Sequence, residues 1–238
     1  MIRFYSPDIA HSGLLSETES GHAVRVLRHT EGDIIEVVDG TGGLHRCRIA
    51  AAHPRHTAVE IIESVKLPKV WAADITLAIA PTKNMDRMEW LVEKLVEIGI
   101  DRIVPVICTH SERRDIKRER LEKIAVSAMK QSLKAVLPQI DEAMPLSRFL
   151  DEDSGHAAKY VGYCDADTER RLLAREYTGG DVRVLIGPEG DFSPAEITAA
   201  VAAGYIPVTL GDNRLRTETA ALTAIDTFHI VNMIRTNI

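Results

Sequence analysis

Two segments near the end of the chain carry residue types that suit binding of a charged ligand. The first runs from Gly187 to Asp191 and is glycine-rich, and the second runs from Leu210 to Thr219. After the first segment, Ser193, Pro194 and Glu196 form a capping-box pattern, which predicts that a helix begins there and presents its N–H groups to the glycines. A tight strand-to-helix turn that needs two glycines is an equally good interpretation from spacing alone.

In the second segment, two arginines precede a predicted helix. Arg214 and Arg216 stand immediately before Thr217, a natural N-cap residue. Two guanidinium groups at a helix N-terminus suit a phosphate, a carboxylate or an oxygen that gains negative charge. The alternative is an ion pair of Arg216 with Glu218 or Glu189, since an isolated arginine more often has a structural role.

The chain lacks the motifs of several common enzyme classes. It contains no GxxxxGK[ST] loop and no GxGxxG after a predicted strand, which disfavours P-loop enzymes and ordinary dehydrogenases. No GxSxG or HExxH segment supports a hydrolase. Cys47, Cys108 and Cys164 are scattered without metal-ligand spacing, so we expect neither a disulfide framework nor a bound metal.

The composition is that of a globular protein. The 238 residues predict one large or two modest domains at about 150 residues per domain. A hydrophobic fraction of 45% and a charged fraction of 27% exclude disordered, collagen-like and coiled-coil classes. The net charge of −6 leaves room only for local basic patches. Without an apolar leader or a run of ~18 apolar residues, we expect a soluble cytoplasmic protein without membrane contact.

The elements that position these segments fall into two groups. Strands at 33–38, 44–49 and 57–62, with a turn at 39–43, predict a small β-barrel or sandwich over residues 1–70. From residue 71 to 238, strands alternate with helices, which predicts a parallel sheet covered on both faces. The strands are expected at 75–80, 102–107, 157–163, 182–186 and 206–210, and the helices at 86–98, 118–133, 168–176, 194–203 and 218–234. Ligands of such a sheet bind beyond the carboxyl ends of its strands, where Cys164–Ala166 forms a third candidate loop.

These motifs resemble a known family. Leu185–Gly190 and Leu210–Ala220 are similar to the signature of the small-subunit (16S) ribosomal RNA uridine-N3 methyltransferases, which belong to the knotted SPOUT class. The chain departs from the family pattern at Asp191, where a glycine is usual, at Asn213, and at Lys134, which replaces an arginine. Further similarity covers nearly the whole chain, at Glu93–Leu95, Glu97–Gly99, Gln131–Ser132, Pro138, His22, Val26–Arg28, Gly32–Asp33 and Asp39–Gly40.

The resemblance implies a PUA-like, RNA-binding β-barrel at 1–70 and an α/β trefoil-knot methyltransferase domain at 71–238. It also implies a homodimer, ribosomal RNA within the small ribosomal subunit as partner, and S-adenosyl-L-methionine as cofactor. The positions that match the family's cofactor loops are Gly187, Pro188, Glu189, Gly190, Leu210, Gly211, Leu215 and Thr219.

Methylation of uridine N3 requires loss of a weakly acidic proton, so positioning and charge stabilisation should dominate. We assign Arg216 to the developing negative charge or to an RNA phosphate. Glu218, with Glu189 as an alternative, is expected to orient that arginine or to accept the proton. The candidate RNA contacts are Arg25, Arg28, Arg114, Arg118, Lys134 and Arg214.

Two other functions remain open. A non-catalytic RNA-binding factor for ribosome assembly would keep the fold without the chemistry. A knotted methyltransferase that acts on another RNA, such as the ribose of transfer RNA, would share the cofactor loops. The N-terminal β region argues mildly against the second of these.

Overall fold

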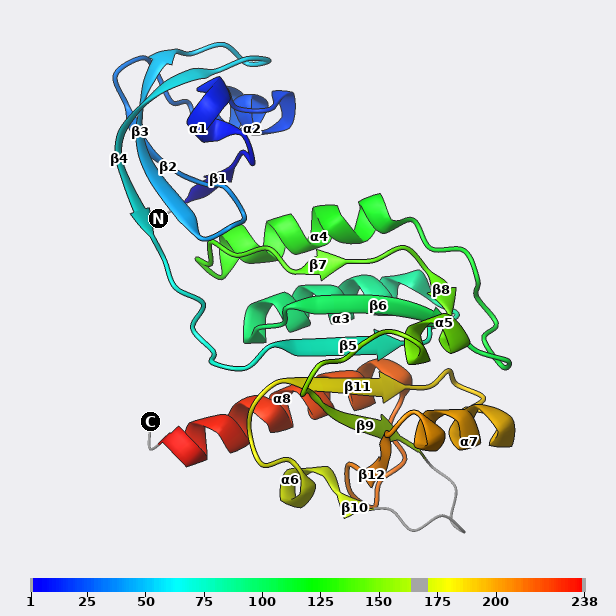
Figure 1. Ribbon diagram of the computed structural model, residues 1–238. Coiled ribbons are helices and arrows are strands. Elements are labelled where there is room, and N and C mark those ends of the chain that lie inside the picture. Colours follow the sequence, from blue (N-terminus) through cyan, green and yellow to red (C-terminus); the bar gives the residue numbers. More distant parts are fainter. Residues whose placement is uncertain (1, 164–170, 237–238) are drawn as a thin grey trace. The chain divides into compact units, whose positions relative to one another are not determined.

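The computed structural model describes residues 2–163 and 171–236, and the chain divides into two compact units. The first unit contains Met1–Val70 and Ala125–Leu137, and the second contains Trp71–Ile124 and Pro138–Ile238. Figure 1 labels their elements along the chain. Within the described ranges, no helix is long and apolar enough to cross a membrane.

A four-stranded sheet forms the centre of the first unit. Its strands follow the order β1 (Arg3–Tyr5), β2 (Ile34–Val38), β3 (Gly43–Ala51) and β4 (Ala58–Lys66). β1 and β2 are parallel, and the other neighbours are antiparallel. Residue 14 bridges to residue 58, which adds a short segment at the outer edge of β4. The three strands predicted for this unit are confirmed.

Three short helices in the first unit were not predicted. They are α1 (Ile9–Ser12), α2 (Glu17–Gly21) and the π-helix η1 (His22–Val26). The sequence contains a signal for α2, because serine is a favoured N-cap residue and Ser16 directly precedes the helix. In the structure the Ser16 side chain accepts a hydrogen bond from the Glu19 amide at 3.2 Å. Helices this short have too few apolar positions for a period to be visible.

The second unit is built on a parallel sheet with the strand order β10-β12-β9-β11-β5-β6-β7, and β8 also pairs with β6. β11 comes late in the sequence but lies between β5 and β9. Figure 1 shows the arrowheads of β5, β6 and β11 at one edge of this sheet. The bounds are β5 Ile75–Ile79, β6 Arg102–Ile107, β7 Gln139–Ile140, β8 Met144–Pro145, β9 Ala158–Gly162, β10 Arg171–Leu172, β11 Val182–Ile186 and β12 Ile206–Thr209.

Helices of the second unit pack against one another in three pairs among the described residues. α3 (Met85–Ile98) packs against α8 (Thr217–Thr236), and α5 (Leu146–Leu150) packs against α7 (Pro194–Ala202). The third pair joins α8 to α6 (Leu173–Glu176). The strands have buried residues on both faces, which explains their continuous apolar sequences. α4 (Arg118–Gln131) begins in the second unit, and its residues from Ala125 onward belong to the first unit.

The prediction of a helix at 168–176 is wrong in part. Residues 171–172 form β10, which pairs with β12, and α6 begins only at Leu173. Residues 168–170 and the candidate loop Cys164–Ala166 lie outside the described residues. The helix predicted at 118–133 ends at Gln131, and Leu133 has a φ of 55°, which is incompatible with a continuing helix.

Phe228 anchors α8 to the sheet of the second unit. Its ring is fully buried, with centroids 4.7 Å from the Tyr177 ring and 6.2 Å from the Tyr160 ring. The Phe228 side chain therefore belongs to the core of its own chain and is not available for a contact with another chain.

We expect Phe228→Ala to lower the free energy of unfolding by about 3–4 kcal/mol, because it removes a large buried ring and leaves a cavity. Urea denaturation followed by tryptophan fluorescence measures this, since Trp71 and Trp90 both lie in the second unit. The control is Asp226→Ala, because Asp226 is an exposed residue of the same helix. Equal midpoints for both variants would contradict this role of Phe228.

Candidate functional site

The two glycine-containing loops meet at the carboxyl edge of the parallel sheet. The loop that begins at Gly187 follows β11, and the loop that begins at Leu210 follows β12 and leads into α8. The Thr217 hydroxyl donates a hydrogen bond to the Gly187 carbonyl at 3.2 Å, and Thr217 is buried. This bond joins the start of α8 directly to the first loop.

The first loop has a defined shape that its sequence explains. Ser193 and Glu196 form the predicted capping box at the start of α7, with Pro194 as the first helical residue. Gly187 and Pro188 are buried, and a Cβ on Gly187 would lie 3.0 Å from the Phe192 ring. Glycine is therefore needed at position 187 for close packing within the loop.

Glu189 binds the backbone of Lys83, whereas the sequence suggests an ion pair with Arg216. Its Oε1 accepts a hydrogen bond from the Lys83 amide at 3.0 Å, in the segment that follows β5. The Lys83 ammonium in turn pairs with Glu112 at 2.8 Å, and hydrogen bonding to Glu112 raises the pKa of Lys83. Glu189 thus links the glycine-rich loop to a neighbouring loop.

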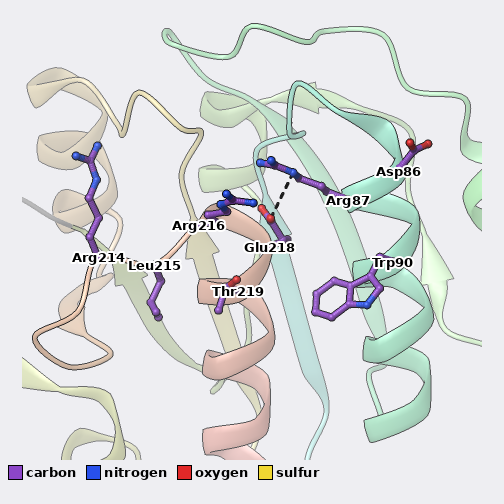
Figure 2. Close-up of a pocket in the computed structure, with 8 residues that line it drawn as sticks. All are labelled: Asp86, Arg87, Trp90, Arg214, Leu215, Arg216, Glu218 and Thr219. Atoms are coloured by element: carbon purple, nitrogen blue, oxygen red, sulfur yellow. Dashed lines mark ion pairs between the residues drawn. The ribbon is translucent and has the colours of Figure 1, made fainter.

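A pocket of about 580 Å³ opens beside the start of α8 (Figure 2). Five of the predicted site residues line it, so the second loop and the start of α8 border one pocket. Three further lining residues come from the first turns of α3. The full lining consists of Asp86, Arg87, Trp90, Arg214, Leu215, Arg216, Glu218 and Thr219.

Glu218 is a buried carboxylate in this pocket. The residue is 6% exposed, and its Oε1 lies 3.6 Å from Nε of Arg87. Its Oε2 is buried and has no hydrogen-bond partner among the described residues. A buried carboxylate oxygen without a partner is costly, so this atom is a strong candidate for contact with a ligand.

The two predicted arginines, Arg214 and Arg216, lie at different places along the pocket. Figure 2 shows Arg216 next to Glu218, while Arg214 lies on the other side of Leu215. Both arginines are exposed, and the ion pair of Glu218 in the described structure is with Arg87 instead of Arg216. The alternative of a structural ion pair for Arg216 is therefore not observed among the described residues.

Sequence reasoning missed the contribution of α3. Asp86, Arg87 and Trp90 lie in its first two turns, and the Asn84 side chain caps the helix by accepting a hydrogen bond from the Asp86 amide at 2.9 Å. The available signal was an arginine and a tryptophan on the less apolar side of an amphipathic helix, near the carboxyl end of β5. Nothing in the spacing links these residues to α8.

The other predicted cofactor residues lie near this region. Leu210 is half-buried, and Gly211 has a φ of 125°, a conformation that favours glycine. Gly190 is exposed and contacts His110. Within the described residues, no group of three His, Cys, Asp or Glu side chains is arranged to hold a metal ion.

The candidate RNA contacts are spread over both units. Arg25, Arg28 and Lys134 belong to the first unit, and the first two are exposed. In the second unit Arg114 is exposed, whereas Arg118 forms ion pairs with Glu122 at 3.0 Å and Glu142 at 3.4 Å. Arg118 therefore has carboxylate partners that compensate its charge, whereas Arg114 is exposed.

Comparison with known proteins supplies the family. Residues 69–229 match the model of an RNA methyltransferase domain, and residues 15–62 match that of an RNA methyltransferase PUA domain. A curated relative, ribosomal RNA small subunit methyltransferase E of Rickettsia conorii, is 28% identical over 216 residues, which cover 89% of this chain and 86% of the relative.

Two solved structures are similar over almost the full length. A "probable rRNA-methyltransferase" from Porphyromonas gingivalis is 45% identical with a TM-score of 0.94, covering 99% of this chain and 100% of that one. Ribosomal RNA small subunit methyltransferase E from Neisseria gonorrhoeae, bound to S-adenosyl methionine, is 29% identical with a TM-score of 0.85, covering 97% and 98%. The expected α/β domain with a parallel sheet, preceded by a PUA-like domain, is confirmed, and the trefoil knot stays a prediction. The chain belongs to the family of RNA methyltransferases that carry a PUA domain in front of the methyltransferase domain.

Proposed function

We propose that this protein transfers a methyl group from S-adenosylmethionine to N3 of a uridine in small-subunit ribosomal RNA, in the cytoplasm. The observation that carries the proposal is the buried Glu218 carboxylate in a pocket with three arginines, directly beside the glycine-rich loop. The named relatives from Rickettsia conorii and Neisseria gonorrhoeae support the choice of substrate and cofactor.

The residues present fit the cofactor. A buried, unpartnered carboxylate oxygen on Glu218 suits a positively charged ligand, and open space surrounds Gly211, where an added Cβ would meet no atom within 4 Å. S-adenosylmethionine supplies an electrophilic methyl group on a cationic sulfur. We assign its binding to Gly187–Gly190, Leu210, Gly211, Leu215 and Thr219.

Glu218 and Arg216 have separate roles in activating the uridine. Methylation forms a bond from N3 to the methyl carbon, the sulfur retains the electron pair of the broken bond, and the N3 proton is lost. Glu218 accepts this proton on Oε2, while Arg87 holds the other oxygen. Arg216 stabilises the negative charge that develops on the uracil carbonyl oxygens.

We expect Arg216→Ala and Glu218→Gln each to lower kcat by about 100-fold or more, since each removes an interaction that is strongest in the transition state. Methyl transfer to small-subunit RNA, with mapping of the modified nucleoside, measures this. Cofactor affinity by calorimetry should change little for Arg216→Ala.

The control variant is Arg175→Ala, which changes an arginine of α6 outside the pocket lining. If wild-type protein binds S-adenosylmethionine but methylates no RNA, the non-catalytic alternative is correct. If Arg216→Ala keeps its activity per molecule and only unfolds at lower temperature, Arg216 has a structural role.

For RNA binding, we propose that the first unit and the segment 113–123 contact the phosphate backbone. Arg114 should contribute more than Arg118, because two carboxylates already neutralise Arg118. Arg114→Gln should reduce the salt slope of RNA binding by about one, as expected for one lost phosphate contact. Arg118→Gln is the matched control and should change the slope less. The reverse order would contradict the assignment.

We also propose a homodimer formed through α8. Ile230, Met233 and Ile234 are 44%, 46% and 69% exposed, and their spacing places them on one face of the helix. Burial of this face against a second copy would remove apolar area from water.

Light scattering at micromolar concentration should report about twice 26.3 kDa. Met233→Glu should shift the mass toward one chain, because it places a charge in the contact. Thr236→Glu, further along the helix, is the comparison variant. An active wild-type species of 26.3 kDa would rule out the dimer.

A further inference from the structure

We infer that His110 is a positioning residue for the glycine-rich loop and that it ties this loop to the segment that carries Arg114. The inference rests on the proposed function, because the loop is the proposed cofactor site. His110 lies between β6 and α4. Its Nδ1 is 3.1 Å from the Gly190 carbonyl oxygen and 3.0 Å from the Asp191 carbonyl oxygen.

The two acceptors determine which ring nitrogen carries the hydrogen. Carbonyl oxygens only accept hydrogen bonds, so Nδ1 of His110 must be the donor to both. Because the C=O and N–H of one peptide point in opposite directions, holding the Gly190 carbonyl also orients the Asp191 amide. That amide donates to the Pro188 carbonyl at 2.9 Å, which closes the turn.

The close approach of His110 also explains the glycine at position 190. The φ of Gly190 lies outside the left-handed region, so the backbone conformation itself does not require glycine. A Cβ on Gly190 would lie 3.1 Å from the Cβ of His110. A side chain at position 190 would therefore displace His110, whether or not a ligand is bound.

His110 is itself held in place by its neighbours. The Thr109 amide donates to Oε1 of Glu196 at 2.7 Å, and the Cys108 amide donates to the Ser111 hydroxyl at 2.9 Å. Burial disfavours the charged form of Glu196, but hydrogen bonds from Ser193 and Thr109 outweigh this and lower its pKa. The carboxylate that caps α7 therefore also fixes the loop of His110.

The same loop is bound to a third loop. Nε of Arg113 donates to the Lys83 carbonyl at 3.1 Å, and the Lys83 amide donates to Glu189 at 3.0 Å. The loops after β6, β5 and β11 thus form a connected set of hydrogen bonds, and these three strands are neighbours in the sheet. A contact of RNA with the exposed Arg114 acts on a segment that directly holds the glycine-rich loop.

The test compares His110→Ala with His110→Asn in the full chain. Asparagine keeps an N–H donor near the position of Nδ1, whereas alanine removes it. Calorimetry with S-adenosylmethionine should show a Kd about tenfold higher for His110→Ala, the size of about one net hydrogen bond, and within about threefold of wild type for His110→Asn. In methylation assays the KM for the cofactor should rise and kcat should change little.

A second readout does not depend on the cofactor. Amide hydrogen exchange in the segment 187–193 of ligand-free protein should be faster in His110→Ala than in wild type and close to wild type in His110→Asn. The matched control is His156→Ala, because His156 is an exposed histidine of the same unit with no contact to this loop among the described residues.

Three outcomes decide between the alternatives. Wild-type affinity and wild-type exchange in His110→Ala overturn the inference. Loss of affinity together with a general fall in thermal stability, without rescue by asparagine, also overturns it, because His110 would then only support the fold. If wild-type protein binds no S-adenosylmethionine, the proposed function fails, while the exchange measurement still decides whether His110 positions the loop.

Discussion

The position of β11 between β5 and β9 is the constraint on which the site depends. Parallel strands end at one edge of a sheet, so this order brings the loops after β5, β6 and β11 next to one another. Hydrogen bonds of Glu189 and His110 then connect residues that are 106 and 80 positions apart in the chain. The hydrogen bond from Thr217 to Gly187 adds the start of α8 to the same edge.

The electrostatics of the pocket follow from this arrangement. Glu218 is buried because α8 begins against α3, and the only ionic partner it has among the described residues is Arg87 of that helix. One carboxylate oxygen is held and the other is left without a partner. A fixed, partly desolvated carboxylate beside exposed arginines is suited to stabilise a cation and to accept a proton, since its charge is poorly screened by water.

Asp191 shows how the chain accommodates a departure from the usual sequence. It has a φ of 60°, a conformation that glycine adopts at low cost and that aspartate tolerates better than most residues. Its Oδ1 accepts a hydrogen bond from the Phe192 amide at 2.8 Å, which offsets part of this cost. The turn therefore forms with an aspartate at position 191, and the Asp191 carbonyl accepts a hydrogen bond from His110.

The sequence by itself determined the local features of the protein. The apolar runs predicted the parallel strands, the Ser193–Glu196 box predicted the start of α7, and the motifs around Gly187 and Arg216 identified the family, because these features depend on neighbours in the chain. Only the tertiary structure decided that Arg87 pairs with Glu218, that Trp90 lines the pocket and that His110 holds Gly190. These contacts join distant segments, and their geometry depends on the strand order, which periodicity and spacing do not encode.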